Sequence, residues 1–163
     1  MKAFSILEAA SISTYIIHHG NEPGYSFLEE GEVSIEISSP EGKSKIYLDT
    51  EGDMYTVCFA DAHEHFDTTE EEEYHLLIQD IIDIMNNKRC SGAIFYNEGN
   101  GELHWCASRF LRADKGMNRS LKEVFSIVYE LNEFREKLER HGGEVHYRFW
   151  DSSLDKNIII PPN

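Results

Sequence analysis

"EVSIEISSPEGKSKIYLDTEGDMYTVCFADAHEHF", residues 32–66, decides the fold class, because it contains three strand-like segments separated by turn residues. In "EVSIEIS" (32–38) every second residue is apolar, which is the pattern of a strand with one buried and one wet face. The turn sequences "SPEG" and "TEGD" enclose a second strand, "KSKIYLD" (43–49). "MYTVCFADAHEHF" (54–66) continues as the third strand. The whole stretch therefore predicts an antiparallel meander.

Beyond this meander the apolar residues recur about every 3.6 residues instead of every second residue. This is the period of an α-helix and predicts a helix over residues 68–86. "SGAIFYN" and "ELHWCASRFL", joined by the turn "EGNG", predict a β-hairpin. A second long helix is predicted over residues 120–140. Its start is marked by a capping box of Ser120 and Glu123, and its end by Gly142.

The remaining segments extend this α+β scheme. "EVHYRFW" (144–150) predicts a last strand, "NIII" (157–160) an edge strand, and "GYSFLEE" (24–30) an additional strand. The first twenty residues are interpreted as a helix. We expect residues 1–163 to form one domain: a mostly antiparallel sheet of about six strands, with the two long helices packed mainly on one face.

The charge of the chain restricts its partners. Lys plus Arg number 15 and Asp plus Glu number 30, which gives a formal net charge of −15. Such a surface repels phosphate backbones and anionic membranes, so direct nucleic-acid binding is the least favoured class and no membrane contact is expected. A basic protein or a cation fits this charge better. The alternative is that the acidity only keeps the protein soluble.

Other sequence features indicate a cytoplasmic protein without catalytic machinery. The N-terminus is a poor match to a secretory signal, and no run approaches the roughly 20 apolar residues of a membrane span. Cys58, Cys90 and Cys106 have no metal-binding or disulfide spacing. No GxSxG, HExxH, P-loop or dinucleotide fingerprint occurs, so neither an enzymatic activity nor a cofactor is predicted.

The segment "DAHEHFDTTEEEEYH" (61–75) has two interpretations. If the strand from Met54 continues unbroken, one face carries a set of metal-ligand types: Asp61, His63, His65 and Asp67. That face also carries Tyr55, Val57 and Phe59, so the polar run is equally typical of a strand that leaves the core. The second half is explained as a helix start, with Asp67, Thr68 or Thr69 as N-cap and glutamates in the first turn. The metal site is therefore the minor alternative.

Two further pairs, His18 with His19 and His104 with Cys106, each have a structural and a catalytic interpretation. His18 and His19 fit a helix C-terminus, where the dipole favours imidazolium, with a catalytic pair as the alternative. His104 and Cys106 begin about 7 Å apart as i and i+2 residues of a strand, which disfavours a directly bonded nucleophile pair. Cys106 is interpreted as a small buried hydrophobe.

Two acidic clusters are the candidate contact surface for a basic partner. One contains Glu29, Glu30, Glu32 and Glu36, and the other contains Asp61, Asp67, Glu70, Glu71, Glu72 and Glu73. In size, acidity and the absence of a catalytic motif, the whole chain resembles the immunity proteins with which bacteria neutralise toxic nucleases, for example in contact-dependent inhibition. The resemblance is one of general character and assigns no residue a role.

That resemblance implies a cytoplasmic binding protein that occludes the active or nucleic-acid-binding surface of a basic toxin domain. In this mechanism carboxylates meet the Lys and Arg side chains with which the toxin holds nucleic acid. The alternatives are another protein-interaction or regulatory module, or a metal-dependent enzyme that uses Asp61, His63 and His65.

Overall fold

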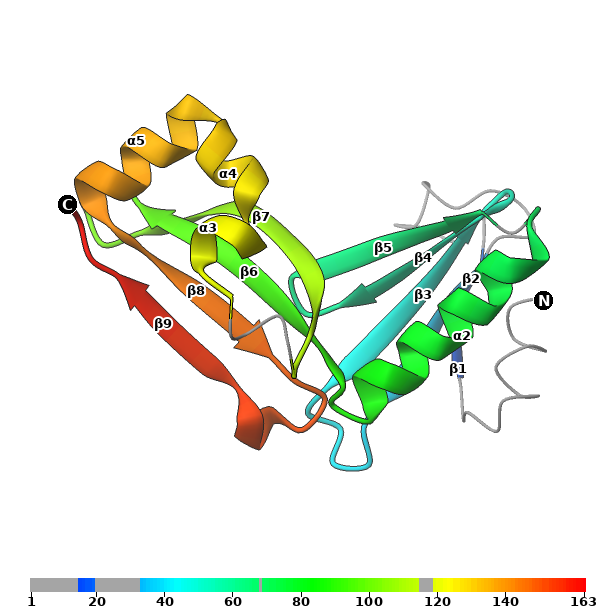
Figure 1. Cartoon of the computed structure of the whole chain (residues 1–163). Coiled ribbons are helices and arrows are strands. Elements are labelled where there is room, and N and C mark those ends of the chain that lie inside the picture. The colour runs from blue at the N-terminus through cyan, green and yellow to red at the C-terminus, as the bar shows by residue number, and fades with distance from the viewer. Residues whose placement is uncertain (1–14, 20–32, 68, 115–118) are drawn as a thin grey trace.

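The computed structural model describes residues 15–19, 33–67, 69–114 and 119–163, and shows an α+β fold with two antiparallel sheets (Figure 1). Sheet A has the order β1 (Tyr15–His19), β2 (Val33–Ser38), β3 (Lys45–Glu51), β4 (Met54–Phe59) and β5 (Ala62–Asp67). Sheet B has the order β7 (Leu103–Arg112), β6 (Arg89–Asn97), β8 (Gly143–Arg148) and β9 (Lys156–Ile160). The fold class is confirmed, but the prediction of a single sheet of about six strands is wrong.

Sheet A contains the predicted meander with one additional reversal. Ile35 and Ile37 of β2 are buried, as the alternation predicts. The predicted third strand over residues 54–66 is a hairpin, because Ala60 adopts a φ of 50° and a two-residue turn joins β4 to β5. Phe59 consequently pairs with Ala62, and every residue beyond the turn lies on the opposite face from the one that an unbroken strand would give it.

The helix α2 (Glu71–Met85) confirms the prediction over residues 68–86 and covers one face of sheet A. Leu77, Ile81 and Ile84 are fully buried against the strands. The N-cap is Glu70, without a side-chain cap, whereas Asp67 accepts hydrogen bonds from Thr69 in the preceding turn. The expected N-cap at Asp67, Thr68 or Thr69 is therefore wrong for Asp67 and Thr69, while Thr68 lies outside the described residues.

Sheet B carries the predicted hairpin and edge strand. Gly99 and Gly101 have φ values of 87° and 91° in the loop between β6 and β7, so each adopts a conformation that a side chain would disfavour. The edge strand β9 pairs with β8, as predicted. The short 3-10 helix η2 (Ser152–Leu154) lies in the connection between them.

The predicted helix over residues 120–140 is three short helices: α3 (Leu121–Val124), α4 (Ser126–Glu130) and α5 (Asn132–His141). The backbone leaves the helical region at Phe125 (φ −116°, ψ 44°) and at Leu131 (φ −81°, ψ 105°). Because of these bends, Val124, Phe125, Val128 and Leu138 all reach the second core, whereas Leu131 is 48 % exposed. The capping box of Ser120 and Glu123 is confirmed, and Gly142 ends α5 with a φ of 70°.

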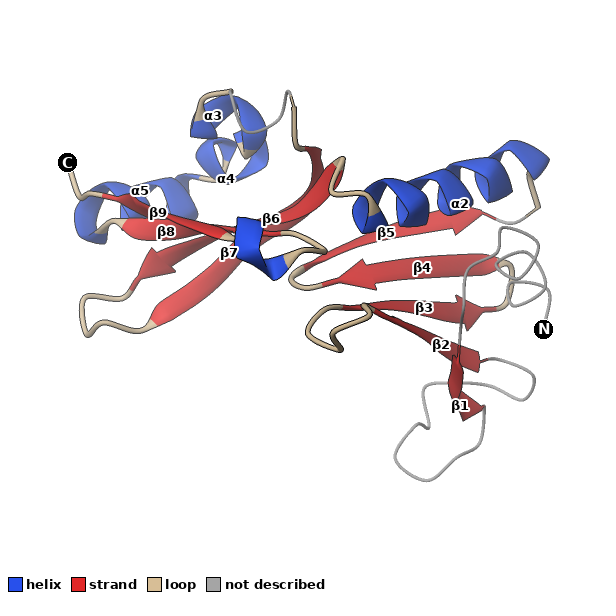
Figure 2. Cartoon of the chain, turned by 90° about the horizontal axis from the view of Figure 1, so that it is seen from below, coloured by secondary structure: helices blue, strands red, loops and turns tan. Residues whose placement is uncertain are grey.

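Each sheet thus has its own helix layer and its own core (Figure 2). The two meet where Phe110 of β7 and Trp150 pack into the core under α2. No helix among the described residues is long and apolar enough to span a membrane. The single-domain organisation stays a prediction, since two cores are compatible with one folding unit or with two.

The N-terminal expectations are only partly covered by the described residues. Residues 15–19 form the strand β1, paired with β2, so the predicted helix is wrong there. His18 and His19 accordingly do not lie at a helix C-terminus. The rest of that predicted helix and the predicted strand over residues 24–30 lie outside the described residues.

Candidate functional site

The negative charge of the chain is concentrated in one part of the sequence. Residues 46–87 contain 12 acidic residues and no lysine or arginine, whereas residues 88–163 contain 11 acidic and 12 basic residues. The first segment folds into nearly all of β3, then β4, β5 and α2. The sheet A side of the molecule therefore generates most of the negative field, and the sheet B side is close to neutral.

Exposed carboxylates gather at one end of sheet A, which we call the acidic end: Glu51, Asp53, Asp67, Glu70, Glu71, Glu72 and Glu73. Glu51 pairs with Met54, which in turn pairs with Asp67, so the β3–β4 turn and the end of β5 are adjacent. Figure 1 shows that α2 begins at this same end. All members are exposed except Glu73, which is half-buried. Like charges on three neighbouring elements reinforce one another as a surface for a cationic partner.

The turn before α2 fixes one of these carboxylates. The backbone N–H of Thr69 donates to Asp67 Oδ1 at 2.9 Å, and the Thr69 hydroxyl donates to the same oxygen at 2.7 Å. These two hydrogen bonds lower the pKa of Asp67 below its ordinary value. The carboxylate is consequently ionised and oriented before any partner arrives.

The structure does not bring all of the predicted acidic residues together. Asp61 lies in the β4–β5 turn, at the opposite end of β5 from Asp67. Glu36 faces Tyr47, four positions along β3 from Glu51, and forms an ion pair with Lys45 at 3.0 Å. Glu29, Glu30 and Glu32 lie outside the described residues. The acidic end is therefore built from Asp67 and Glu70 to Glu73, joined by two carboxylates that sequence reasoning missed, Glu51 and Asp53.

The geometry assumed for the metal alternative is wrong. The β4–β5 turn places His63, His65 and Asp67 on the face opposite Tyr55, Val57 and Phe59, and separates Asp61 from them. The His63 and His65 rings have centroids 5.1 Å apart, and His65 Nδ1 is hydrogen-bonded to Thr56 Oγ1 at 2.8 Å. Within the described ranges, no group of three or more His, Cys, Asp or Glu side chains is placed to hold a metal ion.

The cysteines are poor nucleophiles. Cys58, Cys90 and Cys106 are free thiols, and burial raises the pKa of each to about 11, so they stay protonated at neutral pH. Cys106 Sγ contacts the backbone oxygen of His104 at 3.9 Å, while the His104 ring stacks on Tyr96. The interpretation of Cys106 as a buried small side chain is confirmed.

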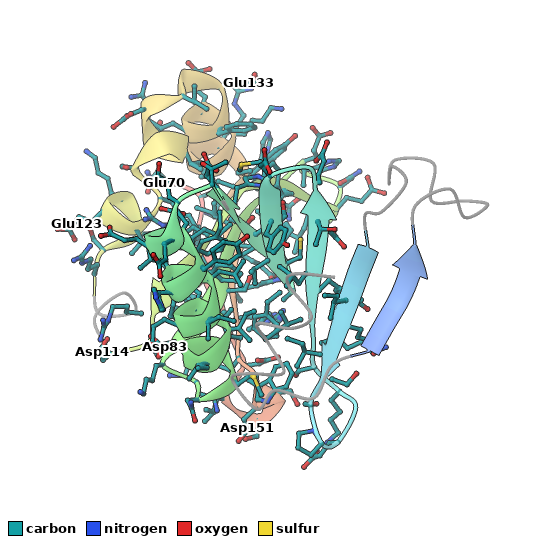
Figure 3. All side chains as sticks on the ribbon, turned by 90° about the vertical axis from the view of Figure 1, so that its right-hand side faces the viewer. Glu70, Asp83, Asp114, Glu123, Glu133 and Asp151 are labelled. Carbon is teal, nitrogen blue, oxygen red and sulfur yellow. The ribbon has the colours of Figure 1, made fainter. Side chains whose placement is uncertain are left out.

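A basic pocket on the sheet B side was missed at the sequence level. It measures about 200 Å³ and is lined by Arg109, Phe110, Leu111, Arg112, Arg119, Glu123 and Val124. Figure 3 shows Glu123 of this lining at α3, and Glu70 at the start of α2. A signal for it is present in the sequence, since residues 109–122 contain five basic residues and one acidic residue. The basic residues are therefore not scattered evenly along the chain.

No protein-family model, curated protein or solved structure matches this chain. Among the described residues, two features bear on function: the acidic end of sheet A and the basic pocket of sheet B. They differ in charge, in shape and in the class of ligand that each would attract.

Proposed function

We propose that this chain is a binding protein that holds a basic protein partner on its sheet A side and performs no chemistry itself. The observation that carries the proposal is the charge of residues 46–87: 12 carboxylates without one lysine or arginine, on consecutive elements of a single sheet and its helix. In most surfaces charges of both signs are mixed, which limits the field. A segment with one sign only attracts cationic surfaces over a longer range.

The fold fixes the backbone that carries this surface. The carboxylates of the acidic end lie on strand ends and on the first turn of α2, and the buried face of that helix is anchored by Leu77, Ile81 and Ile84. A partner therefore meets a backbone that does not have to be ordered on binding, which lowers the entropic cost of association, although the exposed glutamate side chains still lose rotamer freedom. Such complementarity acts mainly on the association rate and makes it sensitive to salt.

The specific partner that we propose is the basic domain of a toxin, in particular a nuclease. A nuclease holds the phosphates of its substrate with lysine and arginine side chains, and these are the groups that a dense set of carboxylates can occupy. The chain would act in the cytoplasm, where it would cover the active or nucleic-acid-binding surface of the toxin. This proposal rests on charge and on general character, and assigns no catalytic residue.

Co-expression with the product of the neighbouring gene, the expected toxin, tests the proposal. The two separate readouts are formation of a complex and survival of the cells that express the toxin. A Glu70→Gln, Glu71→Gln, Glu72→Gln variant removes three exposed carboxylates from the acidic end. The matched control is Glu130→Gln, Glu136→Gln, Glu139→Gln, which removes three exposed carboxylates from the sheet B side. We expect the association rate to fall about tenfold or more in the first variant at low salt, and to change little in the control.

The outcomes separate the general proposal from the specific one. Complex formation without rescue of the cell would retain the binding protein and exclude toxin neutralisation. Equal losses in the two variants would show that only the total charge matters, and would contradict the acidic end as the contact surface. If no complex forms and no rescue occurs, the proposed function is wrong.

A further inference from the structure

The basic pocket between β7 and α3 is the strongest candidate for a second binding site. Arg109 and Arg112 come from β7, and Arg119 precedes the capping box of α3. The chain has seven arginines, and three of them line this one pocket. Because the whole chain carries a charge of −15, such a gathering of guanidinium groups is unexpected from composition.

The single carboxylate in the pocket lining is committed to the helix start. Glu123 Oε2 accepts hydrogen bonds from the backbone N–H of Ser120 at 3.0 Å and from its hydroxyl at 2.7 Å. These bonds, with a smaller contribution from Arg119, lower the pKa of Glu123. Among the described residues, the lining therefore has three cations and one anion, which leaves an excess of positive charge.

Among the described residues, the contacts of Arg109 and Arg112 leave most of their N–H donors for a ligand. Arg109 Nη1 donates to the backbone oxygen of Val124 at 3.2 Å, which fixes its guanidinium at the wall of the pocket. Arg112 Nε lies 3.5 Å from Asp114 Oδ1, and this pair is exposed and weak. An arginine has five N–H donors, and each of these contacts uses one of them.

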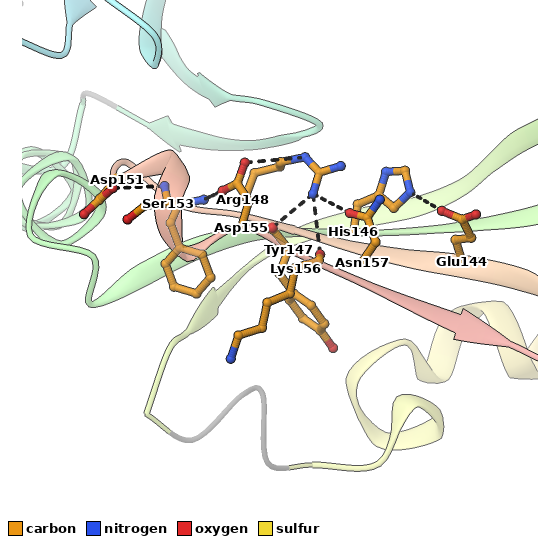
Figure 4. Close-up of polar contacts among 10 residues, drawn as sticks. Glu144, His146, Tyr147, Arg148, Asp151, Ser153, Asp155, Lys156 and Asn157 are labelled. Atoms are coloured by element: carbon orange, nitrogen blue, oxygen red, sulfur yellow. Dashed lines mark hydrogen bonds and ion pairs between the residues drawn. The ribbon is translucent and has the colours of Figure 1, made fainter. Parts of the chain in front are cut away.

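A larger pocket elsewhere in the molecule also contains three cations, but these have close acceptors within the protein. It measures about 280 Å³ and includes Lys43, Lys45 and Arg148 in its lining. Lys43 is paired with Glu41 at 2.8 Å and Lys45 with Glu36 at 3.0 Å. Arg148 Nη1 donates to Asn157 Oδ1 at 2.7 Å and to the backbone oxygens of Tyr147 and Lys156, as Figure 4 shows. Each of these three cations has a side-chain acceptor within 3.0 Å, whereas the contacts of Arg109 and Arg112 in the basic pocket are longer, at 3.2 and 3.5 Å.

We propose that the basic pocket binds the phosphate group of a small anionic ligand. A carboxylate is matched by one arginine, whereas a phosphate dianion has enough oxygen acceptors for several guanidinium groups. The volume of about 200 Å³ holds a phosphate with a small remainder against the apolar wall of Leu111 and Val124. The site is independent of the proposed function, because it lies on the near-neutral sheet B side, away from the acidic end.

Isothermal titration calorimetry of the full chain tests this site with three probes: inorganic phosphate, phenyl phosphate and acetate. The test variant is Arg109→Gln, Arg119→Gln. The control variant, Arg140→Gln, Lys156→Gln, removes the same number of charges from exposed positions outside the pocket. We expect saturable phosphate binding in the wild type and the control, and binding about tenfold or more weaker in the test variant.

Three results would overturn the proposal: no saturable phosphate binding to the wild type, equal weakening in both variants, or acetate binding as tight as phosphate. Equal affinity for the two phosphates would assign free phosphate as the ligand, and tighter binding of phenyl phosphate would assign a phosphate ester. Since Arg109 also supports Val124, circular dichroism checks that the test variant is folded. If it is not, the single Arg112→Gln variant, at a 65 % exposed side chain, replaces it.

Discussion

The two halves of the molecule share one layout and differ in charge. In each half an antiparallel sheet has helices on one face and a core between them. The segment that builds most of sheet A and α2 carries a formal charge of −12, whereas residues 88–163, which build sheet B and α3 to α5, carry +1. The arrangement of sheet, helices and core therefore does not determine the charge of the surface. A net charge of −15 describes one half of this protein and misdescribes the other.

The halves are joined by a partly buried ion network as well as by apolar packing. Arg89 of β6 forms an ion pair with Asp80 of α2 and a hydrogen-bonded pair with Glu64 of β5 at 2.9 Å. The Arg89 guanidinium also lies over the Phe110 ring, 5.3 Å from its centroid. Two elements of the acidic half, α2 and β5, thus meet β6 and β7 of sheet B at one side chain, which couples the halves.

The largest expected effects are those of core truncations in the two halves. Ile81→Ala and Phe125→Ala each remove a fully or almost fully buried side chain and should lower the free energy of unfolding by about 3 to 4 kcal/mol. If the halves form one cooperative unit, each variant shifts the same single urea transition. Far-UV circular dichroism and the fluorescence of Trp150, which packs into the core of sheet A, should then coincide when both are measured in a Trp105→Phe background. Two transitions, with each variant moving only one, would contradict the single-domain prediction.

Arg89→Ala should have the next largest effect, because it breaks the junction itself. The Arg89 and Asp80 side chains are only 17 % and 13 % exposed, so removal of the cation leaves a poorly solvated carboxylate. We expect a loss of roughly 2 to 3 kcal/mol in urea unfolding. Arg140→Ala, at an exposed position in the last turn of α5, is the control and should change stability by less than about 0.5 kcal/mol. Equal effects would show that the network contributes nothing beyond charge.

The same junction predicts a contrast in pH dependence between two aspartates of the acidic half. Burial raises the pKa of Asp80 to about 6, more than the adjacent Arg89 lowers it. The native state therefore holds a proton that the unfolded chain releases near pH 4, and the contribution of Asp80 to stability falls as the pH rises from about 4 to about 6. Asp67, whose pKa is lowered, contributes in the opposite direction and at lower pH, because its stabilisation is complete above about pH 4 and is lost as the pH falls below that value.

Carboxyl ¹³C NMR would measure both titrations directly. We expect the midpoint of Asp80 near pH 6 and that of Asp67 below its ordinary value. Between pH 4 and 6, the free energy of unfolding of the wild type, measured with urea, should fall with pH because of Asp80. In Asp80→Asn this decrease should disappear, even if the substitution also lowers the free energy of unfolding by a constant amount at every pH. A midpoint of Asp80 below 4 would show that pairing with Arg89 outweighs burial.

Most of the individual elements were predictable, because local patterns determine them. Alternation marked β2 and β8, the flanking turn sequences marked β3, the run "NIII" before Pro161 marked β9, and the 3.6-residue period marked α2. The β4–β5 reversal was missed because Ala60 and Asp61 include neither glycine nor proline, although Ala60 adopts a positive φ. The bends at Phe125 and Leu131 were missed for a related reason: packing against sheet B imposes them on a sequence that favours one helix.

The candidate sites divide in the same way. The run from Glu70 to Glu73 is local in sequence, and its place at the start of a helix was predicted. The membership of Glu51 and the exclusion of Asp61 depend on strand register and on the missed turn. The basic pocket depends on β7 lying beside α3, so spacing in the sequence alone could not assemble it.

The smallest expected effect separates the helix starts of the two halves. The Ser120 side chain caps α3, whereas α2 begins at Glu70 without a side-chain cap and has three glutamates in its first turn. Ser120→Ala should therefore cost about 1 kcal/mol, and Ser126→Ala, at an exposed position in α4, much less. Conversely, Glu70→Ser supplies the missing cap and removes one of several like charges, so it should stabilise α2 by a few tenths of a kcal/mol. If Glu70→Ser destabilised the protein instead, the carboxylates of the first turn would stabilise the helix. They would then not be a destabilising feature that the protein keeps for the sake of its contact surface.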